Sequence, residues 1–204
     1  MKTVCRLACL AFLALMCAGC GDHREKETGI QEPADYAGWL ALAEKGNADA
    51  QFNVGVLLMA GQAVAADPQA AVEWWKRAAQ RGCADAQFNL GALYAAGRIV
   101  EKDVAHAVKW YRMAARAGCI EAQHNLGLAY YLGQGVERDA KEAVTWFRRA
   151  AEQGDGKAQC FLGDCYYIGR GVAKDREAAI AWYRKSAAQG YEPARERLAG
   201  AGAK

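Results

Sequence analysis

One spacing of 36 residues organises most of this chain, and no insertion or deletion interrupts it. Alanine, glycine, aspartate and tryptophan all return at this interval. The positions are Ala50, Ala86, Ala122, Ala158 and Ala194; Gly61, Gly97, Gly133 and Gly169; Asp67, Asp103, Asp139 and Asp175; and Trp74, Trp110, Trp146 and Trp182. Because small, turn-forming and bulky residues return together, the sequence indicates an array built from one repeated structural unit.

Each copy predicts two helices joined by a turn. Gly61 stands where the first helix would end in a left-handed conformation, Asp67 where a side chain would cap the second helix, and Pro68 at the first position of that helix. The apolar positions of the first helix are Ala50, Val54, Leu57 and Leu58. Those of the second are Ala71, Val72, Trp75, Ala78 and Ala79.

Glycine also recurs inside the first helix of each copy, at Gly55, Gly91, Gly127 and Gly163. Glycine in a helix costs ~1 kcal/mol relative to alanine, so its return indicates a point where helices approach closely. A helical hairpin of this size cannot bury its own apolar face, and the units must therefore stack into an all-α superhelix.

The stack is predicted to span residues 35–200. The expected segments are a half repeat at 35–46, full repeats at about 47–82, 83–118, 119–154 and 155–190, and a capping helix at 191–200. Four helix pairs and two half units give about ten helices.

The segment AQHNLGLAYYLGQGVERDAKEAVTWFRRAAEQG, from Ala122 to Gly154, resembles the Sel1-like repeat, a relative of the tetratricopeptide repeat (TPR). The resemblance covers about residues 35–200. It implies a right-handed, TPR-like α/α solenoid of antiparallel helices that acts as an adaptor in multiprotein assemblies, often in bacterial envelopes. Ala63 and Ile99 depart from the pattern at the second loop glycine, so we expect those two turns to be less tightly wound.

The first 19 residues are typical of a secretory signal. Lys2 and Arg6 precede an apolar run at 7–16, which is too short to cross a bilayer of ~30 Å as a helix. Small residues then lead to Cys20, in a sequence that resembles the bacterial lipobox, although Cys17 stands where that motif has leucine. We expect lipidation at Cys20, with a plain secretory signal cut near Cys20 as the alternative.

Residues 20–34 are then a lipidated N-terminus and a flexible tether, because they are polar and aperiodic. Gly21 stands where the rule for inner-membrane retention wants aspartate. The resemblance therefore implies an exported outer-membrane lipoprotein that faces the periplasm and is held to the membrane by its lipid. A soluble periplasmic or secreted protein is the alternative.

Composition argues against nucleic-acid binding. The whole chain has a net charge of +3, from 26 basic and 23 acidic residues. Removal of Lys2 and Arg6 with the signal leaves 24 basic residues against the same 23 acidic ones, and no basic patch stands out.

Catalysis is not expected, although some cysteine-rich relatives are described as binding or hydrolysing penicillins. The chain has one serine, Ser186, at a position that is alanine in other copies, and no S-x-x-K motif provides it with a base. We interpret it as a packing residue. A hydrolase acting on cell-wall or β-lactam substrates stays an alternative.

The cysteines beyond Cys20 predict neither a disulfide staple nor a metal site. Cys160 and Cys165 are five residues apart on one helix, and Cys83 and Cys119 are equivalent positions of adjacent units, so both pairs are poorly placed to bond. We expect Cys165 to be a buried thiol and Cys160 to lie on the exposed face. Cys160 and His124 share a register position, but two such ligands without a third do not indicate a metal, and no cofactor is expected.

The surface expected to bind is the concave face of the first helices, which lines the groove of TPR-type stacks. Tyr131 and Tyr167 vary between copies and are expected to face outwards, and exposed tyrosine is enriched at binding hot spots. Asparagine amides at a neighbouring position would pair with the backbone of an extended peptide or tie down a turn. The predicted groove residues are Phe52, Asn53, Phe88, Asn89, His124, Asn125, Tyr131, Cys160 and Tyr167. The sequence thus favours a non-catalytic adaptor for a protein or peptide partner, with a purely structural envelope protein as a further alternative.

Overall fold

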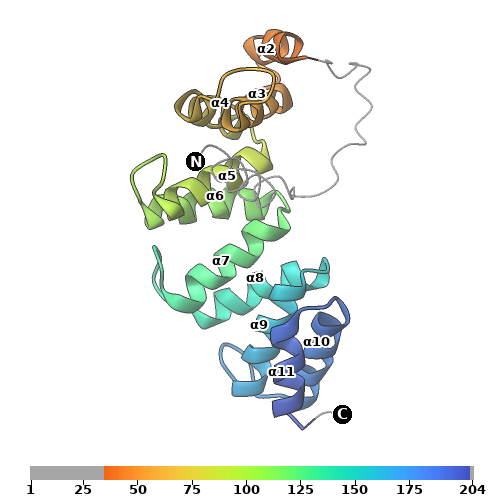
Figure 1. Cartoon of the computed structure of the whole chain (residues 1–204). Coiled ribbons are helices and arrows are strands. Elements are labelled where there is room, and N and C mark those ends of the chain that lie inside the picture. Colours follow the sequence, from red (N-terminus) through yellow and green to blue (C-terminus); the bar gives the residue numbers. More distant parts are fainter. Residues whose placement is uncertain (1–34, 203–204) are drawn as a thin grey trace, which may run out of the picture. The chain divides into compact units, whose positions relative to one another are not determined.

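The computed structural model describes residues 35–202, and this part of the chain contains helices and no strand (Figure 1). The prediction of an all-α array of about ten helices is confirmed. The helices are α2 (Tyr36–Glu44), α3 (Ala48–Ala60), α4 (Pro68–Gln80), α5 (Ala84–Ala96), α6 (Val104–Arg116), α7 (Ile120–Leu132), α8 (Ala140–Glu152), α9 (Gly156–Ile168), α10 (Arg176–Ala188) and α11 (Glu192–Gly200). The predicted signal at 1–19, Cys20 and the tether at 20–34 lie outside the described residues.

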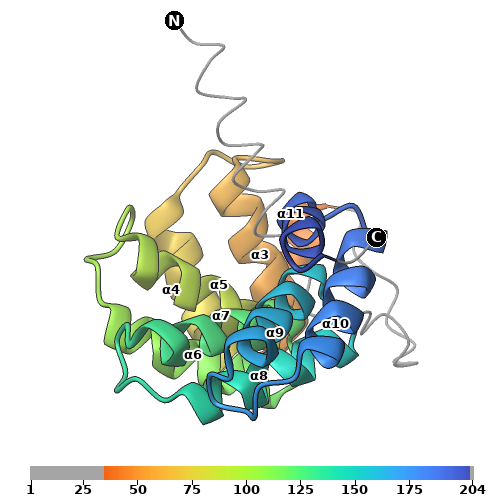
Figure 2. The same ribbon diagram turned by 90° about the horizontal axis from the view of Figure 1, so that it is seen from below.

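The chain divides into two compact units, each made of successive helices. In the first, which the structure describes from residue 35 to Cys119, α2 packs on α3, α3 on α4, α4 on α5 and α5 on α6 (Figure 1). In the second, which begins at Ile120, α7 packs on α8, α8 on α9, α9 on α10 and α10 on α11 (Figure 2). Within each unit, every helix therefore covers its neighbour in sequence, as the repeat pattern predicted.

The predicted helix ends are confirmed. Gly61 follows α3 with φ of 64°, and the equivalent glycines after α5 and α9 are also left-handed. The Asp67 side chain accepts a hydrogen bond from the Ala70 backbone N–H (2.9 Å), and Asp103, Asp139 and Asp175 cap their helices in the same way. A left-handed glycine stop and an aspartate start thus delimit the helices of each copy.

The expectation for the turn at Ala63 is wrong. Ala63 keeps a left-handed φ of 60°, close to the 70° and 79° of its counterparts Gly135 and Gly171, and no other non-glycine residue in 35–202 has a positive φ. The first turn is therefore wound like the glycine turns, and Ala63 bears the strain of its Cβ.

The two predicted apolar stripes meet in the core. All five stripe residues of α4 are buried, and so are Ala50, Val54 and Leu58 of α3.

The close approach predicted at the internal glycines is also confirmed. A Cβ added to Gly55 would lie 2.4 Å from Nε1 of Trp75, and one on Gly163 would lie 2.6 Å from the Tyr183 ring. The aromatic residue of each second helix therefore packs on the bare backbone of the first.

A buried glutamine near the start of the first helix links it to the helix before, a feature that the sequence analysis missed. The side-chain Nε2 of Gln51 donates to the Ala43 carbonyl (3.0 Å), that of Gln87 to the Ala79 carbonyl (3.0 Å), and that of Gln159 to the Ala151 carbonyl (3.1 Å). The amide nitrogen of each of these buried side chains thus donates to a backbone carbonyl of the preceding helix.

The last helix is held by an ionic contact. Arg197 of α11 donates from Nε to the Asp164 carboxylate of α9 (2.6 Å), and the Tyr183 hydroxyl of α10 donates to the same oxygen (2.8 Å). Asp164 stands where the other copies carry Val56, Ala92 and Leu128. One carboxylate thus joins the three helices at the end of the array.

Candidate partner-binding surface

The predicted groove residues of the first unit are only partly accessible. Phe52 is half-buried and stacks on Trp75 with 6.3 Å between ring centroids. Phe88 is buried against Tyr111, with a centroid distance of 5.9 Å. Asn53 is half-buried, and Asn89 is only 1% exposed. The prediction that Phe88 and Asn89 lie on an open surface is wrong.

In the second unit, His124 and Cys160 are also buried. Cys160, expected on the exposed face, instead packs with Ala179, Tyr183 and Ala194, and burial raises the pKa of its thiol to about 11. The reason is the same in both units. This register position of the first helix faces the aromatic ladder of the second helix, at Trp75, Tyr111, Phe147 and Tyr183, rather than solvent.

Tyr131 is part of an aromatic cluster, which we define as His124, Tyr131, Phe147 and Phe161. The Phe147 and Phe161 rings stack at 5.3 Å between centroids, and the Tyr131 ring lies 6.1 Å from Phe147 and 6.4 Å from Phe161. The His124 ring contacts both phenylalanines, at 6.0 Å and 5.6 Å. Tyr131 is thus half-buried and not fully outward as expected.

Arg170 fixes Tyr131 from the loop after α9. Its guanidinium carbon lies 3.7 Å from the Tyr131 ring centroid, and its Nη2 donates to the Tyr131 carbonyl (2.7 Å). A cation over an aromatic face is attracted to the ring, and the hydrogen bond adds direction. The C-terminal ends of α7 and α9 are therefore joined.

Large apolar side chains are exposed at these joined ends. Leu132 is 53% exposed, Ile168 55% and Tyr167 37%. Together with the half-buried Tyr131 they form what we call the C-terminal apolar patch. Tyr167 thus lies on the surface as predicted, and Asn125 is half-buried.

Leu132 and Ile168 were missed by the sequence analysis. They are equivalent to Ala60 and Ala96, so two copies carry alanine where two carry large apolar residues. This change from alanine to a large apolar residue could have marked the position as part of a candidate binding surface.

His124 has the electrostatics of a buried base. Its Nδ1 lies 3.5 Å from the Asp155 carboxylate at the start of α9. Burial lowers the pKa of His124 below its ordinary value of 6.5, and the attraction of Asp155, opposed by the repulsion of Lys157, does not restore it. The neutral imidazole is therefore the form that the fold favours.

This lowered pKa predicts a loss of stability in mild acid. The unfolded chain binds more protons than the folded one between the lowered pKa and 6.5, so stability should fall as the pH drops through this window. We expect His124→Phe, which installs the residue of the first two copies, to remove part of the fall in Tm between about pH 7.5 and about pH 5.5. Equal falls in both proteins, measured by circular dichroism, would contradict the assignment.

Comparison with known proteins identifies the repeat. The model of the Sel1 repeat matches four consecutive segments, at residues 48–83, 84–119, 120–155 and 156–191. The chain belongs to the Sel1 repeat family. Each matched segment begins one residue after the start expected from the spacing alone. Sel1 repeat proteins are generally scaffolds for protein–protein interactions, and their fold is typically non-enzymatic.

Two solved structures have the same fold. A protective antigen present in uropathogenic Escherichia coli strains, which displays an SLR fold, is 40% identical over 81% of this chain, with a TM-score of 0.77. A Sel1 repeat protein from Oxalobacter formigenes is 36% identical over 80% of this chain, with a TM-score of 0.72. The chain covers 36% of the first structure and 66% of the second. No curated protein matches the sequence.

Ser186 has the packing role that the sequence predicted in this Sel1 repeat chain. It is fully buried, and its hydroxyl donates to the Gly156 carbonyl (2.6 Å).

Cys83, Cys160 and Cys165 are free thiols, and no group of three His, Cys, Asp or Glu side chains within 35–202 is placed to hold a metal. No helix in that range is both long and apolar enough to span a membrane.

Asn89 is the most unusual polar residue of the predicted set. Both atoms of its buried amide lack a hydrogen-bond partner within the described structure. A buried polar group without a hydrogen-bond partner lowers the stability of the folded state by ~1–3 kcal/mol, so the Asn89 amide does not stabilise the fold. The asparagines were expected either to pair with the backbone of a bound peptide or to tie down a turn. Within residues 35–202, the Asn89 side chain makes no hydrogen bond to a turn.

Proposed function

We propose that this chain is a non-catalytic adaptor that binds a protein or peptide partner through the C-terminal apolar patch. The observation that carries the proposal is the exposure of Leu132, Tyr167 and Ile168 on adjoining helix ends. Clustered apolar surface costs free energy in water and is typical of interaction sites. The Sel1 repeat family, whose members generally bind proteins, supports the same role.

Arg170 and the aromatic cluster give this surface a rigid base. The Tyr131 ring contacts the rings of Phe147 and Phe161, and the Arg170 guanidinium lies over its face. A partner that packs on the patch would therefore order few side chains on binding, which keeps the entropic cost of association low. An aromatic anchor on a rigid support is a common arrangement at binding hot spots.

The proposal includes an envelope location. The charged start, the apolar run and the lipobox-like end of residues 1–20 support an outer-membrane lipoprotein facing the periplasm, with a soluble periplasmic or secreted protein as the alternative. Incorporation of labelled palmitate at Cys20, absent from a Cys20→Ala chain, tests the anchor. Catalysis is not proposed, because Ser186 is buried and its hydroxyl is already hydrogen-bonded.

Photocrosslinking in cells tests the binding surface. A photoreactive amino acid at position 168 should yield a discrete crosslinked protein, because Ile168 lies in the patch. The same amino acid at position 96 is the control. Ala96 is the equivalent position of the second repeat and is also exposed, but it lies outside the patch, so no crosslinked protein is expected there.

Substitutions provide the quantitative arm of this test. Leu132→Ala combined with Ile168→Ala installs the alanines of the first two copies, and should lower partner recovery at least ~10-fold if the patch contains hot-spot residues. Because both side chains are exposed, Tm should change little. Undiminished recovery by the double variant would show that the partner binds elsewhere.

A further inference from the structure

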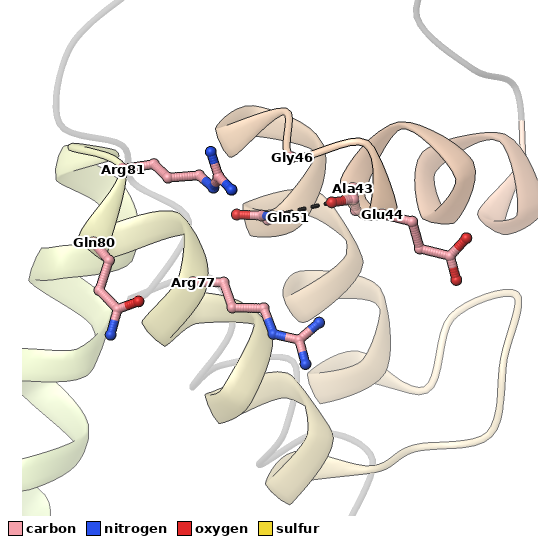
Figure 3. Close-up of a pocket in the computed structure, with 7 residues that line it drawn as sticks. All are labelled: Ala43, Glu44, Gly46, Gln51, Arg77, Gln80 and Arg81. Atoms are coloured by element: carbon pink, nitrogen blue, oxygen red, sulfur yellow. Dashed lines mark hydrogen bonds between the residues drawn. The ribbon is translucent and has the colours of Figure 1, made fainter.

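A second candidate site lies in the first unit, among α2, α3 and α4. It is a pocket of about 330 Å³, with Glu44, Gln51, Arg77, Gln80 and Arg81 in its lining (Figure 3). A volume of this size accommodates a small molecule or the end of a peptide. The pocket shares no residue with the C-terminal apolar patch, so the two surfaces can be altered independently.

Gln51 supplies an unused acceptor to this pocket. The residue is 3% exposed, and its Nε2 is used in the hydrogen bond to the Ala43 carbonyl. Its Oε1 has no partner within the described structure, and in Figure 3 this oxygen lies on the side of Arg81, opposite Ala43. A buried carbonyl oxygen of this kind lacks a donor that a ligand N–H can provide.

This acceptor is satisfied in the third and fourth repeats, whereas in the second repeat Oε1 of Gln87 has no partner within residues 35–202, as in the first. The Oε1 of Gln159 accepts from Nε2 of Gln189 (2.8 Å), and that of Gln123 accepts from Nε2 of Gln153 (2.7 Å). In the first repeat, the residue equivalent to Gln153 and Gln189 is Arg81. The glutamine oxygen is therefore paired with an amide in the third and fourth repeats and unpaired in the first two. The partner position is Ala117 in the second repeat and a cation, Arg81, in the first.

Contacts within the first unit restrain both arginines that line the pocket. A Cβ added to Gly46 would lie 3.1 Å from Nη2 of Arg81, so the guanidinium lies against the backbone at the start of α3. The guanidinium carbon of Arg77 lies 4.6 Å from the Trp74 ring centroid. Two guanidinium groups favour a carboxylate or another small anion.

We propose that this pocket binds a carboxylate that carries a neighbouring N–H group, as in the C-terminal residue of a peptide or an N-acylated amino acid. Arg77 and Arg81 bind the carboxylate, and Gln51 Oε1 accepts the N–H. Glu44 lines the same pocket, and its charge disfavours a doubly charged anion such as phosphate. A carboxylate with no neighbouring N–H would leave the Gln51 oxygen without a donor.

Calorimetric titration of the full chain with small probes tests the chemistry. N-acetyl-alanyl-alanine with a free carboxylate should bind at least ~10-fold more tightly than the same dipeptide as a C-terminal amide, or than inorganic phosphate. N-acetyl-alanine distinguishes the two sources, since equal affinity for it indicates an acylated amino acid and weaker affinity a peptide C-terminus. Equal binding of the free and amidated dipeptides, or of phosphate, would overturn the proposal, and so would the absence of binding.

Matched variants locate the probe. Arg81→Gln installs the residue that closes the equivalent position in the third and fourth repeats, and should reduce affinity at least ~10-fold without lowering Tm. Arg149→Gln is the control, because Arg149 is the equivalent of Arg77 and lies on the Trp146 ring in a repeat whose acceptor is already satisfied. Unchanged binding by Arg81→Gln would overturn the proposal. Leu132→Ala with Ile168→Ala should leave probe binding intact, which separates this test from that of the partner surface.

Discussion

Replacement of Trp75 by alanine is expected to lower the free energy of unfolding by ~3–5 kcal/mol, among the largest effects of a single substitution in this chain. Trp75 is 1% exposed and packs on Phe52 and on the backbone at Gly55. Its Nε1 also donates to the Phe52 carbonyl (3.1 Å). Alanine would leave a cavity between α3 and α4 and remove that donor.

The neighbouring tryptophan provides the control. Trp74 is half-buried and has Arg77 over its ring, so Trp74→Ala leaves no enclosed cavity and should cost less than half as much. Urea unfolding followed by circular dichroism at 222 nm compares the two variants. Equal losses would mean that the closed contact between α3 and α4 does not dominate the stability of this repeat.

Gly127→Ala is expected to destabilise the second unit by ~1–3 kcal/mol, although alanine is the better helix former by ~1 kcal/mol. The added Cβ would lie 2.6 Å from Cδ1 and 2.7 Å from Cε1 of Phe147. Phe147 is fully buried and stacked on Phe161, so its ring cannot move aside without disturbing the aromatic cluster. Overpacking should therefore outweigh the gain in helix propensity.

Gly200→Ala separates the two effects. Gly200 is the last residue of α11, and a Cβ there meets nothing within 4 Å. This substitution should leave stability unchanged or raise it slightly. The same denaturant measurement applies, and a gain in stability from Gly127→Ala would refute the close approach of α7 and α8.

Most of the fold could be predicted because its determinants are local and recur in every copy. Gly61 and Asp67 specify helix ends through their own backbone and side-chain chemistry, and the apolar stripe that contains Trp75 follows from helical spacing. The conformation of the turn at Ala63 was predicted wrongly, because we assumed that only glycine would adopt a left-handed conformation at this position. The fold instead imposes the left-handed conformation on alanine.

The candidate surface was predicted less well because it depends on which rows of equivalent residues pack against each other. We call such a row, formed by one position in successive repeats, a ladder. Phe88, His124 and Cys160 form one ladder in sequence, and Tyr111, Phe147 and Tyr183 form another. Spacing alone does not show that the first faces the second. Gln51 and Arg81 are likewise 30 positions apart, and their relation becomes visible only once Gln159 and Gln189 are seen hydrogen-bonded.

The carboxylate of Asp164 gives the repeats an order. At this register, Val56, Ala92 and Leu128 have apolar neighbours, whereas Asp164 requires the Tyr183 hydroxyl and the Arg197 guanidinium. If the fourth repeat exchanged places with an earlier one, its carboxylate would lose Arg197, and the repeat now beside α11 would leave that arginine without a counterion. The units are alike in shape but not interchangeable, so a terminal repeat is distinguished by one charged side chain.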